Sequence, residues 1–380
     1  MSSERIIIPQ DSHKGFVYVR EKEIALKINH DQKGFVPPKM EEYLRNLQEQ
    51  SNFNFANLIL VAKNALFFMQ GSTHMALRKE TLKVFGKKSI QNWEIEIEKI
   101  VDAHLCSLEN CSTVDVVRQY TTPIFTEITQ QILGIHPIDK DKFDFWTQQL
   151  QVLLQPLLPI RELLRMEDAF SDIIAQVKNV PIDNKISATL PATLLEVLKN
   201  SNLVDFTEDD AIATTIVVYG AAINLSQTLA NIIWHILSGP PEIKTKAKDK
   251  EWVISNMEYL IKIGASPKYI HAISATDQQI EHKSFKKGDN VLLDLLEIHD
   301  VGCPFSKQNL WDRDAISKQD HMAFGTGIHF CIGAFLTRIV IEKSIPVLFS
   351  KFPDMEIIEK VPQLTSNNQT IIIKSLPVNI

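Results

Sequence analysis

Basic residues are scarce in this chain of 380 residues relative to acidic ones. The 40 Lys and Arg residues are outnumbered by 46 Asp and Glu residues, which gives a formal net charge of -6 and a pI of about 6.0. A chain with this balance has no basic field to attract nucleic acid or an anionic membrane. We therefore expect no nucleic-acid partner.

Cysteines and long apolar runs are also few. The four cysteines, at positions 106, 111, 303 and 331, lack the regular spacing of a secreted disulfide framework. The N-terminal apolar run spans only residues 6–8, shorter than the ~7–15 residues of a signal-peptide core. No segment reaches the ~18 uninterrupted apolar residues of a membrane span. These absences predict a cytoplasmic protein with no membrane anchor.

The chain does contain a hydrophobic content of 44%, enough for a sizeable core. It also shows helical periodicity. From about residue 74 to 240, apolar residues recur at three-and-four spacing, and one such segment is "KFDFWTQQLQVLLQPLL" at 142–158. The longest helix is expected to begin at a capping box of Thr207 and Asp210, to end at Gly239, and to be buried at the centre. Short β-like runs follow residue 264. With no repeat, low-complexity tract or linker, residues 1–380 are expected to form one mostly helical domain with a small β portion.

The segment "MAFGTGIHFCIGAFLTR", residues 322–338, places glycines, a His and a Cys before an expected helix. Glycines at 325 and 327 allow a positive φ or a close approach to a ligand. Cys331 would lie at the N-terminal end of the helix, where the dipole favours the thiolate that binds metals. A buried structural cysteine and half of a zinc site are the alternatives, although no second ligand pair is present for zinc.

This segment resembles the haem-binding loop of the cytochrome P450 superfamily, whose pattern is F-x-x-G-x-H/R-x-C-x-G. The matching residues are Phe324, Gly325, Gly327, His329, Cys331 and Gly333. The resemblance implies the cytochrome P450 fold, with a long central helix over haem b and the Cys loop on the proximal side. It also implies that Cys331 is the axial thiolate, which favours O–O cleavage, and that His329 binds a haem propionate.

A second resemblance lies upstream, in "FFMQGSTHMALRKETLKVF". It is similar to the family's C-helix segment, in which a His and an Arg reach the other propionate. His74 and Arg78 are four residues apart, so they share one face of a helix. An ordinary basic helix face is the alternative.

Two family features are missing. Where the family has Glu-x-x-Arg, this chain has Glu258 and Ile261, so the carboxylate must find Arg313, Lys262, backbone N–H groups or solvent. Where related bacterial sequences have a propionate-binding Arg, this chain has Ile273. His271 would replace that Arg only if the strand register turns its side chain toward the haem.

The central helix also departs from the family, which usually carries an acid and an alcohol there to deliver protons. The chain reads "VVYGAAINLSQT". Aligned on Gly220, the acid becomes Ala222 and the alcohol Ile223; shifted by one residue, the alcohol becomes Asn224. Gly220, Ala221 and Asn224 are the predicted catalytic positions, although Asn224 could instead bond within its own helix.

Three functions are consistent with this pattern. The first is a monooxygenase with non-standard proton delivery, which hydroxylates, epoxidises or oxidatively couples an apolar or carrier-bound intermediate of specialised metabolism. The second is a hydroperoxide-rearranging, dehydrating or peroxide-using haem-thiolate enzyme. The third is a non-catalytic haem-binding scaffold.

Substrate and donor contacts follow only from the resemblance. The apolar segments at 53–70 and 150–164 are expected to line a distal pocket or to be simply core. A ferredoxin-type electron donor is expected at the face nearest the Cys loop, where Lys87, Lys88 and Arg338 are candidate contacts.

Overall fold

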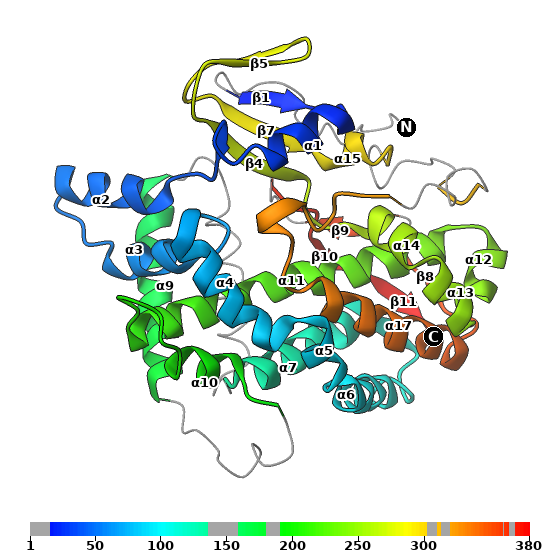
Figure 1. Ribbon diagram of the computed structural model, residues 1–380. Helices are drawn as coiled ribbons and strands as arrows, with labels where there is room; N and C mark the ends of the chain where they lie inside the picture. The colour runs from blue at the N-terminus through cyan, green and yellow to red at the C-terminus, as the bar shows by residue number, and fades with distance from the viewer. Residues whose placement is uncertain are drawn as a thin grey trace.

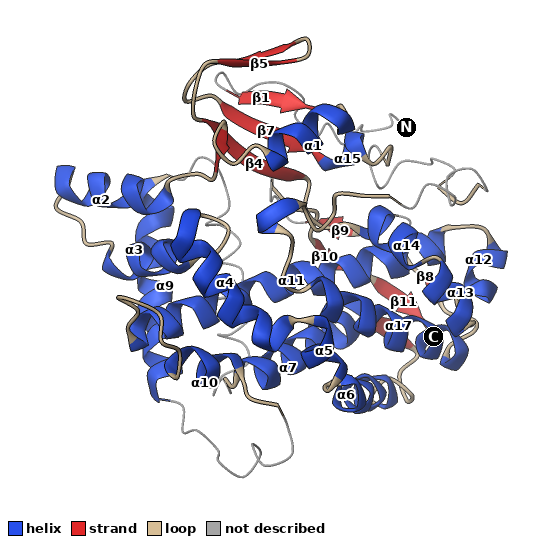
Figure 2. Ribbon diagram, viewed as in Figure 1, coloured by secondary structure: helices blue, strands red, loops and turns tan. Residues whose placement is uncertain are grey.

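Helices dominate the described chain, as the sequence predicts (Figure 2). The computed structural model describes residues 16–135, 159–179, 191–301, 310–312, 320–359, 361–364 and 369–380. The helices are α1 Lys22–His30, α2 Met40–Gln50, α3 Ala56–Asn64, α4 Gly71–Phe85, α5 Lys87–Gln91, α6 Glu94–Cys106, α7 Thr122–Leu133, α9 Ile160–Asn179, α10 Leu194–Lys199, α11 Glu208–Ser238, α12 Pro241–Lys246, α13 Lys250–Ser255, α14 Met257–Gly264, α15 Leu295–Ile298 and α17 Ala334–Lys351. A π-helical turn spans Val117–Thr121 and a 3-10 turn Gly327–His329. The helix expected at 142–158 and Arg313 lie outside the described residues.

The strands form small sheets rather than a β core. The strands are β1 Phe16–Val19, β2 Phe35–Val36, β3 Thr113–Asp115, β4 Tyr269–Ser274, β5 Gln278–Ile280, β6 Lys283–Phe285, β7 Asn290–Asp294, β8 Glu356–Ile357, β9 Gln363–Leu364, β10 Ile373–Ser375 and β11 Pro377–Asn379. The largest sheet has the order β1-β7-β4-β2, in which only β1 and β7 are parallel. One face of this sheet packs on α1 through Val19, Val291 and Leu293, and it lies at the top of the view in Figure 1.

Helix α11 runs through the centre of the molecule and packs against α7, α14, α3, α10 and α9 (Figure 1). Within the described chain it is a helix long and apolar enough to cross a membrane, but 78% of its most apolar window is buried inside the protein. A helix that is apolar on nearly all sides is expected at the core of a protein of this size. The burial of α11 therefore fits its place as the central core helix.

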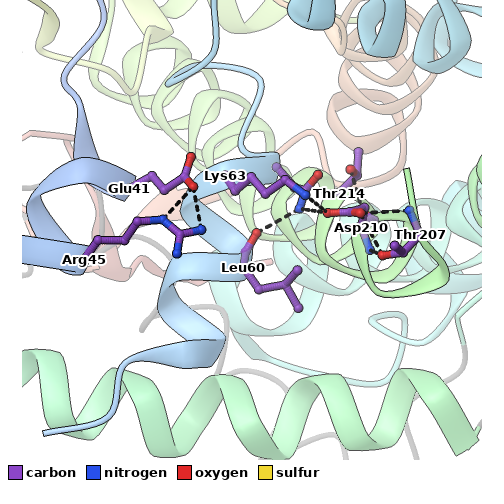
Figure 3. A network of polar contacts seen from close by, with 8 residues as sticks. Glu41, Arg45, Leu60, Lys63, Thr207, Asp210 and Thr214 are labelled. Atoms are coloured by element: carbon purple, nitrogen blue, oxygen red, sulfur yellow. Dashed lines mark hydrogen bonds and ion pairs between the residues drawn. The ribbon is translucent and has the colours of Figure 1, made fainter. Parts of the chain in front are cut away.

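The start of α11 is fixed to α3 by a buried carboxylate (Figure 3). Asp210 and Thr207 form the predicted capping box, in which the Thr207 N–H donates to Asp210 Oδ2 at 2.8 Å. Lys63 Nζ and Asn64 Nδ2 from α3 both reach Asp210 Oδ1, at 2.8 Å and 2.7 Å. Since Asp210 is only 1% exposed, these bonds set the register of α11 against α3. Asn224 follows Asp210 by fourteen residues, which is about 21 Å along the axis.

Candidate active site

The loop before α17 turns back on itself through two left-handed glycines. Gly325 and Gly327 have φ of +65° and +66°, a conformation that costs a residue with a Cβ about 1–2 kcal/mol. The backbone N–H of Cys331 then donates to the Phe324 carbonyl at 2.8 Å and closes the loop. Asn29, near the end of α1, donates from Nδ2 to Thr326 Oγ1 at 2.5 Å and holds the outside of the turn. The glycines identified from the sequence thus have a conformational role.

Cys331 is a free, half-buried thiol at the N-terminal end of α17. Burial raises the pKa of this thiol. The N–H groups of Gly333 and Ala334 and the positive charges of Arg78 and Arg338 act in the opposite direction and lower its pKa. The sulfur therefore lies among groups that stabilise a thiolate, while burial removes the water that would otherwise do so. Such a sulfur can serve as a ligand for a metal ion that supplies the remaining charge.

Gly333 lies where α11 approaches the start of α17 closely. A Cβ at this position would lie 3.2 Å from Leu225 Cδ1 of α11 and 3.8 Å from Cys331 Sγ. The side chain of Leu225 thus faces the start of α17, one residue beyond Asn224. Sequence reasoning did not identify Leu225, because the helix has no motif that fixes which residue faces the Cys loop.

The structure brings His329 beside His74 and Arg78, which lie more than 250 residues earlier in the sequence. The rings of His74 and His329 have centroids 4.5 Å apart. Arg78, one turn along α4 from His74, donates to the carbonyl of Phe330 beside Cys331. Burial lowers the pKa of His74 to about 4 and also lowers the pKa of His329.

His74 is completely buried, and both of its ring nitrogens lack a hydrogen-bond partner among the described residues. A buried polar group without a partner costs about 1–3 kcal/mol. A ligand that brings carboxylate oxygens to this place would satisfy His74 and pair with Arg78. The residues present therefore fit the propionate end of a haem.

A cavity of about 350 Å³ adjoins this group. Gly220, Ala221 and Asn224 of α11 line one side, and Phe324, Gly325 and His329 of the Cys loop line another. The segment at 53–70 contributes Val61, Phe67 and Phe68, as the sequence suggests for a pocket wall. Asn224 Oδ1 is buried and has no hydrogen-bond partner among the described residues, so no bond within its helix accounts for it. The cavity is thus mainly apolar with a few polar groups directed at it, as is usual for small-molecule sites.

His271 also lies along the wall of this cavity, but the register of its strand turns it from the Cys loop. Its Nε2 is 2.9 Å from Asn290 Oδ1, and its ring is 6.2 Å from that of Phe16. Ile270, on the opposite face of β4, reaches within 4.0 Å of a Cβ placed on Gly325. This geometry does not favour His271 as a replacement for the missing Arg.

Glu258 finds a partner that the sequence did not indicate. Arg338 of α17 donates from both Nε and Nη2 to the two carboxylate oxygens, each at 2.7 Å. His321 adds a contact from Nε2 at 3.0 Å. Arg338, a candidate contact for the electron donor on the resemblance, is thus engaged in an ion pair within the protein. Ile261, at the place of the family's Arg, is fully buried in apolar core.

The hydrogen bond from His321, and the Arg338 charge, lower the pKa of Glu258 to about 2 against the opposing effect of burial. Because the folded pKa of Glu258 lies below the ordinary 4.5, the charged group stabilises the fold above pH 4.5, and this contribution is lost as the pH falls toward 2.

We expect Glu258→Gln to lower the free energy of unfolding of the cofactor-free protein at pH 7, with a difference from wild type that shrinks between pH 4.5 and 2. Urea unfolding at a series of pH values measures this. A matched control is Glu41→Gln, which removes a carboxylate of similar exposure that pairs with Arg45 on its own helix. Equal pH profiles for the two variants would contradict the expectation.

A cysteine loop at the start of a helix thus faces a long central helix across a mainly apolar cavity, the arrangement that the sequence resemblance implies for a haem-thiolate protein. No protein-family model matches the chain. The chain is 27% identical over 313 residues to cytochrome P450 CYP107DY1 of Priestia megaterium. This alignment covers 80% of the chain and 74% of the relative. It is 23% identical over 355 residues to the polyketide biosynthesis cytochrome P450 PksS of Bacillus subtilis strain 168, and the alignment covers 90% of this chain and 82% of the relative.

A solved structure has the same fold. The crystal structure of P450BioI in complex with acyl carrier protein ligated with hexadec-9Z-enoic acid aligns with a TM-score of 0.80 and 17% identity, over 96% of this chain and 92% of that one. The sequence relatives of the chain are thus bacterial cytochromes P450, and its fold is the cytochrome P450 fold. The chain is a P450-type oxidoreductase of the monooxygenase class, and its cofactor is haem b with an axial cysteine thiolate.

Proposed function

We propose that Cys331 supplies the axial thiolate of a monooxygenase whose substrate is an apolar acyl chain, presented free or as a thioester of a carrier protein. The observation that carries this proposal is the cavity shared by the Cys331 loop and Asn224, which is lined mainly by apolar side chains. In this proposal His74, Arg78 and His329 hold the haem propionates, and Phe324, Gly325 and Gly333 shape the loop around the cofactor. Haem supplies the oxygen-activating chemistry when it is bound.

The choice of an acyl chain is supported by the cavity and by two relatives. Apolar side chains from α1, the segment at 53–70 and α11 would contact a hydrocarbon substrate and exclude water from it. P450BioI was crystallised with an acyl carrier protein, and PksS is named for polyketide biosynthesis. The proposed substrate class is therefore an acyl intermediate of specialised metabolism.

The electron donor in this proposal is a ferredoxin-type protein. Lys87 and Lys88 are exposed at the start of α5, which packs against α17, the helix that follows the Cys331 loop. They are the described cations that we propose as donor contacts, since Arg338 is bonded to Glu258. Lysines at a rim act mainly on the rate of association, so their effect should weaken with added salt.

The reduced, carbon-monoxide-bound difference spectrum tests the cofactor part of the proposal. The purified protein is expected to give the Soret band of a thiolate-ligated haem. Spectral titration with a long-chain acyl carrier protein and with the corresponding free acid then tests the substrate part. We expect saturable binding of at least one of them, and turnover that requires NAD(P)H, ferredoxin, ferredoxin reductase and O2.

A peroxide-using enzyme is the second candidate, favoured by the presence of an amide side chain, Asn224, in the lining of the cavity. An amide can hold a peroxide oxygen by a hydrogen bond without supplying a proton. Incubation with a lipid hydroperoxide and no reductant separates the two: consumption favours this second candidate. Turnover dependent on reductant and O2 favours the monooxygenase, and the absence of both reactions favours a haem-binding scaffold.

A further inference from the structure

The ion pair of Glu258 joins two helices rather than two residues of one helix. Glu258 lies on α14, whereas Arg338 lies on α17, seven residues after Cys331. Two donor atoms of the guanidinium meet two carboxylate oxygens at 2.7 Å, the paired geometry that fixes both direction and distance. Arg338 Nη1 also donates to the Ala334 carbonyl at 3.0 Å, within the first turn of α17. The carboxylate therefore holds the helix that begins directly behind Cys331.

The same carboxylate also holds the start of the loop. His321 is 7% exposed at its side chain, and its Nδ1 accepts the backbone N–H of Ala323 at 3.2 Å. A ring nitrogen that accepts leaves the proton of the neutral ring on Nε2, which is the atom that contacts Glu258. Glu258 is thus bonded to a residue before Cys331 and to another after it.

The ring of Phe324 lies between these groups and connects them to Cys331. The Arg338 guanidinium carbon is 4.9 Å from the centroid of the Phe324 ring, and the His321 ring is 5.7 Å from it. The Phe324 carbonyl accepts the Cys331 N–H at 2.8 Å. A cation over an aromatic face is worth about 0.5–2 kcal/mol, depending on how far it is removed from water. Movement of Arg338 would therefore be transmitted to the backbone bond that orients Cys331.

We propose that Glu258, Arg338 and His321 form a clamp that sets the position of the Cys331 sulfur, with Arg338 as its positioning residue. Arg338 supplies from α17 the cation that α14 lacks at Ile261. As a result, the ion pair is made by the helix that follows the Cys331 loop, and not by α14 alone. This inference rests on the proposed function, because it assumes that Cys331 binds the haem iron.

The alternative is that the cation on α17 only stabilises the fold. Lys343 provides a matched control, since it lies on the same helix and pairs with Glu94 and Glu98 of α6 at 2.8 Å and 3.0 Å, away from the Cys loop. The variants are Arg338→Gln, Arg338→Lys and Lys343→Gln, each purified as the haem-loaded protein. Circular dichroism and urea unfolding of the haem-free forms record any change in the fold itself.

Two measurements test the clamp: haem affinity of the apoprotein by haemin titration, and the thiolate-ligated fraction in the reduced, carbon-monoxide-bound spectrum. Loss of a group that orients a metal ligand typically costs about 10–100-fold in metal affinity. We expect Arg338→Gln to show a loss of this size and a lower thiolate fraction, Arg338→Lys to recover at least part of both, and Lys343→Gln to match wild type.

Equal values for Arg338→Gln and Lys343→Gln would overturn the clamp while leaving the proposed function in place. If wild type itself gives no thiolate-type spectrum, the proposed function fails first. Should Arg338→Gln not fold, Glu258→Gln takes its place, because it keeps the shape of the carboxylate and removes the charge that orients the guanidinium.

Discussion

Cys331→Ser is expected to abolish the thiolate-type spectrum of the reduced, carbon-monoxide-bound protein and to reduce oxygenation to background. An alcohol does not ionise in the range where a thiol does, so the N–H groups of Gly333 and Ala334 and the charge of Arg78 would face a neutral oxygen. The oxygen is also a poorer electron donor to iron than the sulfur it replaces. The change in volume is small, so the loop closed by the Cys331 N–H and the Phe324 carbonyl should remain folded.

Cys111→Ser is the control for this substitution. Cys111 is also a free cysteine of intermediate exposure, but it lies after α6, far along the chain from the loop. We expect its haem spectrum, haem content and turnover to equal those of wild type. A thiolate-type spectrum retained in Cys331→Ser would contradict the assignment of Cys331 as the ligand.

The Cys loop could be predicted from sequence because its determinants are local. Gly325 and Gly327 are required by the backbone itself, and the N-terminal end of a helix beside Cys331 follows from the apolar period after it. The same holds for the capping box of Thr207 and Asp210 at the start of α11. Both partners of each of these interactions lie within a few positions of one another, so a short segment of sequence is enough to predict them.

The partner of Glu258 could not be predicted, because it depends on how two helices pack. The sequence directs attention to Ile261, one turn away on the same helix, while the cation comes from Arg338, which is eighty residues further along the chain. The orientation of His271 was likewise open until the pairing of β4 with β7 fixed its face. His74 and Arg78 were indicated by their spacing. Only the tertiary structure brings His329 beside His74, with their ring centroids 4.5 Å apart.

The central helix α11 lacks the acid and alcohol that the sequence resemblance leads one to expect. A substitution in this helix is the second one for which we expect a large effect on activity. Asn224 lines the cavity, and its carboxamide oxygen is buried without a hydrogen-bond partner among the described residues. The residue that follows it is Leu225, which packs toward Gly333. An apolar residue cannot hold a proton donor near a reacting oxygen. The amide of Asn224 does not supply a proton itself, but it can hold by hydrogen bonds a water that does so beside Gly220 and Ala221 of α11.

Asn224→Leu is therefore expected to lower the rate of product formation by about 100-fold, the lower range for loss of a positioned proton-transfer group. Reducing equivalents should then be diverted from product to hydrogen peroxide, because electron delivery is unchanged while the proton step is impaired. The measurement is the ratio of product and peroxide formed to NAD(P)H consumed, with ferredoxin and its reductase in excess.

Thr215→Val is the control on the same helix. Thr215 is fully buried, and its hydroxyl donates to the Ala211 carbonyl at 2.8 Å, so the substitution removes a polar group of α11 away from the cavity. We expect the product ratio of Thr215→Val to equal that of wild type even if its stability is lower.

A product ratio within twofold of wild type in Asn224→Leu would place the proton source outside α11. The substrate itself, or water admitted with it, would then be the donor. If instead hydroperoxide consumption without reductant falls in Asn224→Leu, the amide serves to hold a peroxide, and the peroxide-using function becomes the better account of why this helix carries an amide at 224 and an apolar residue at 225.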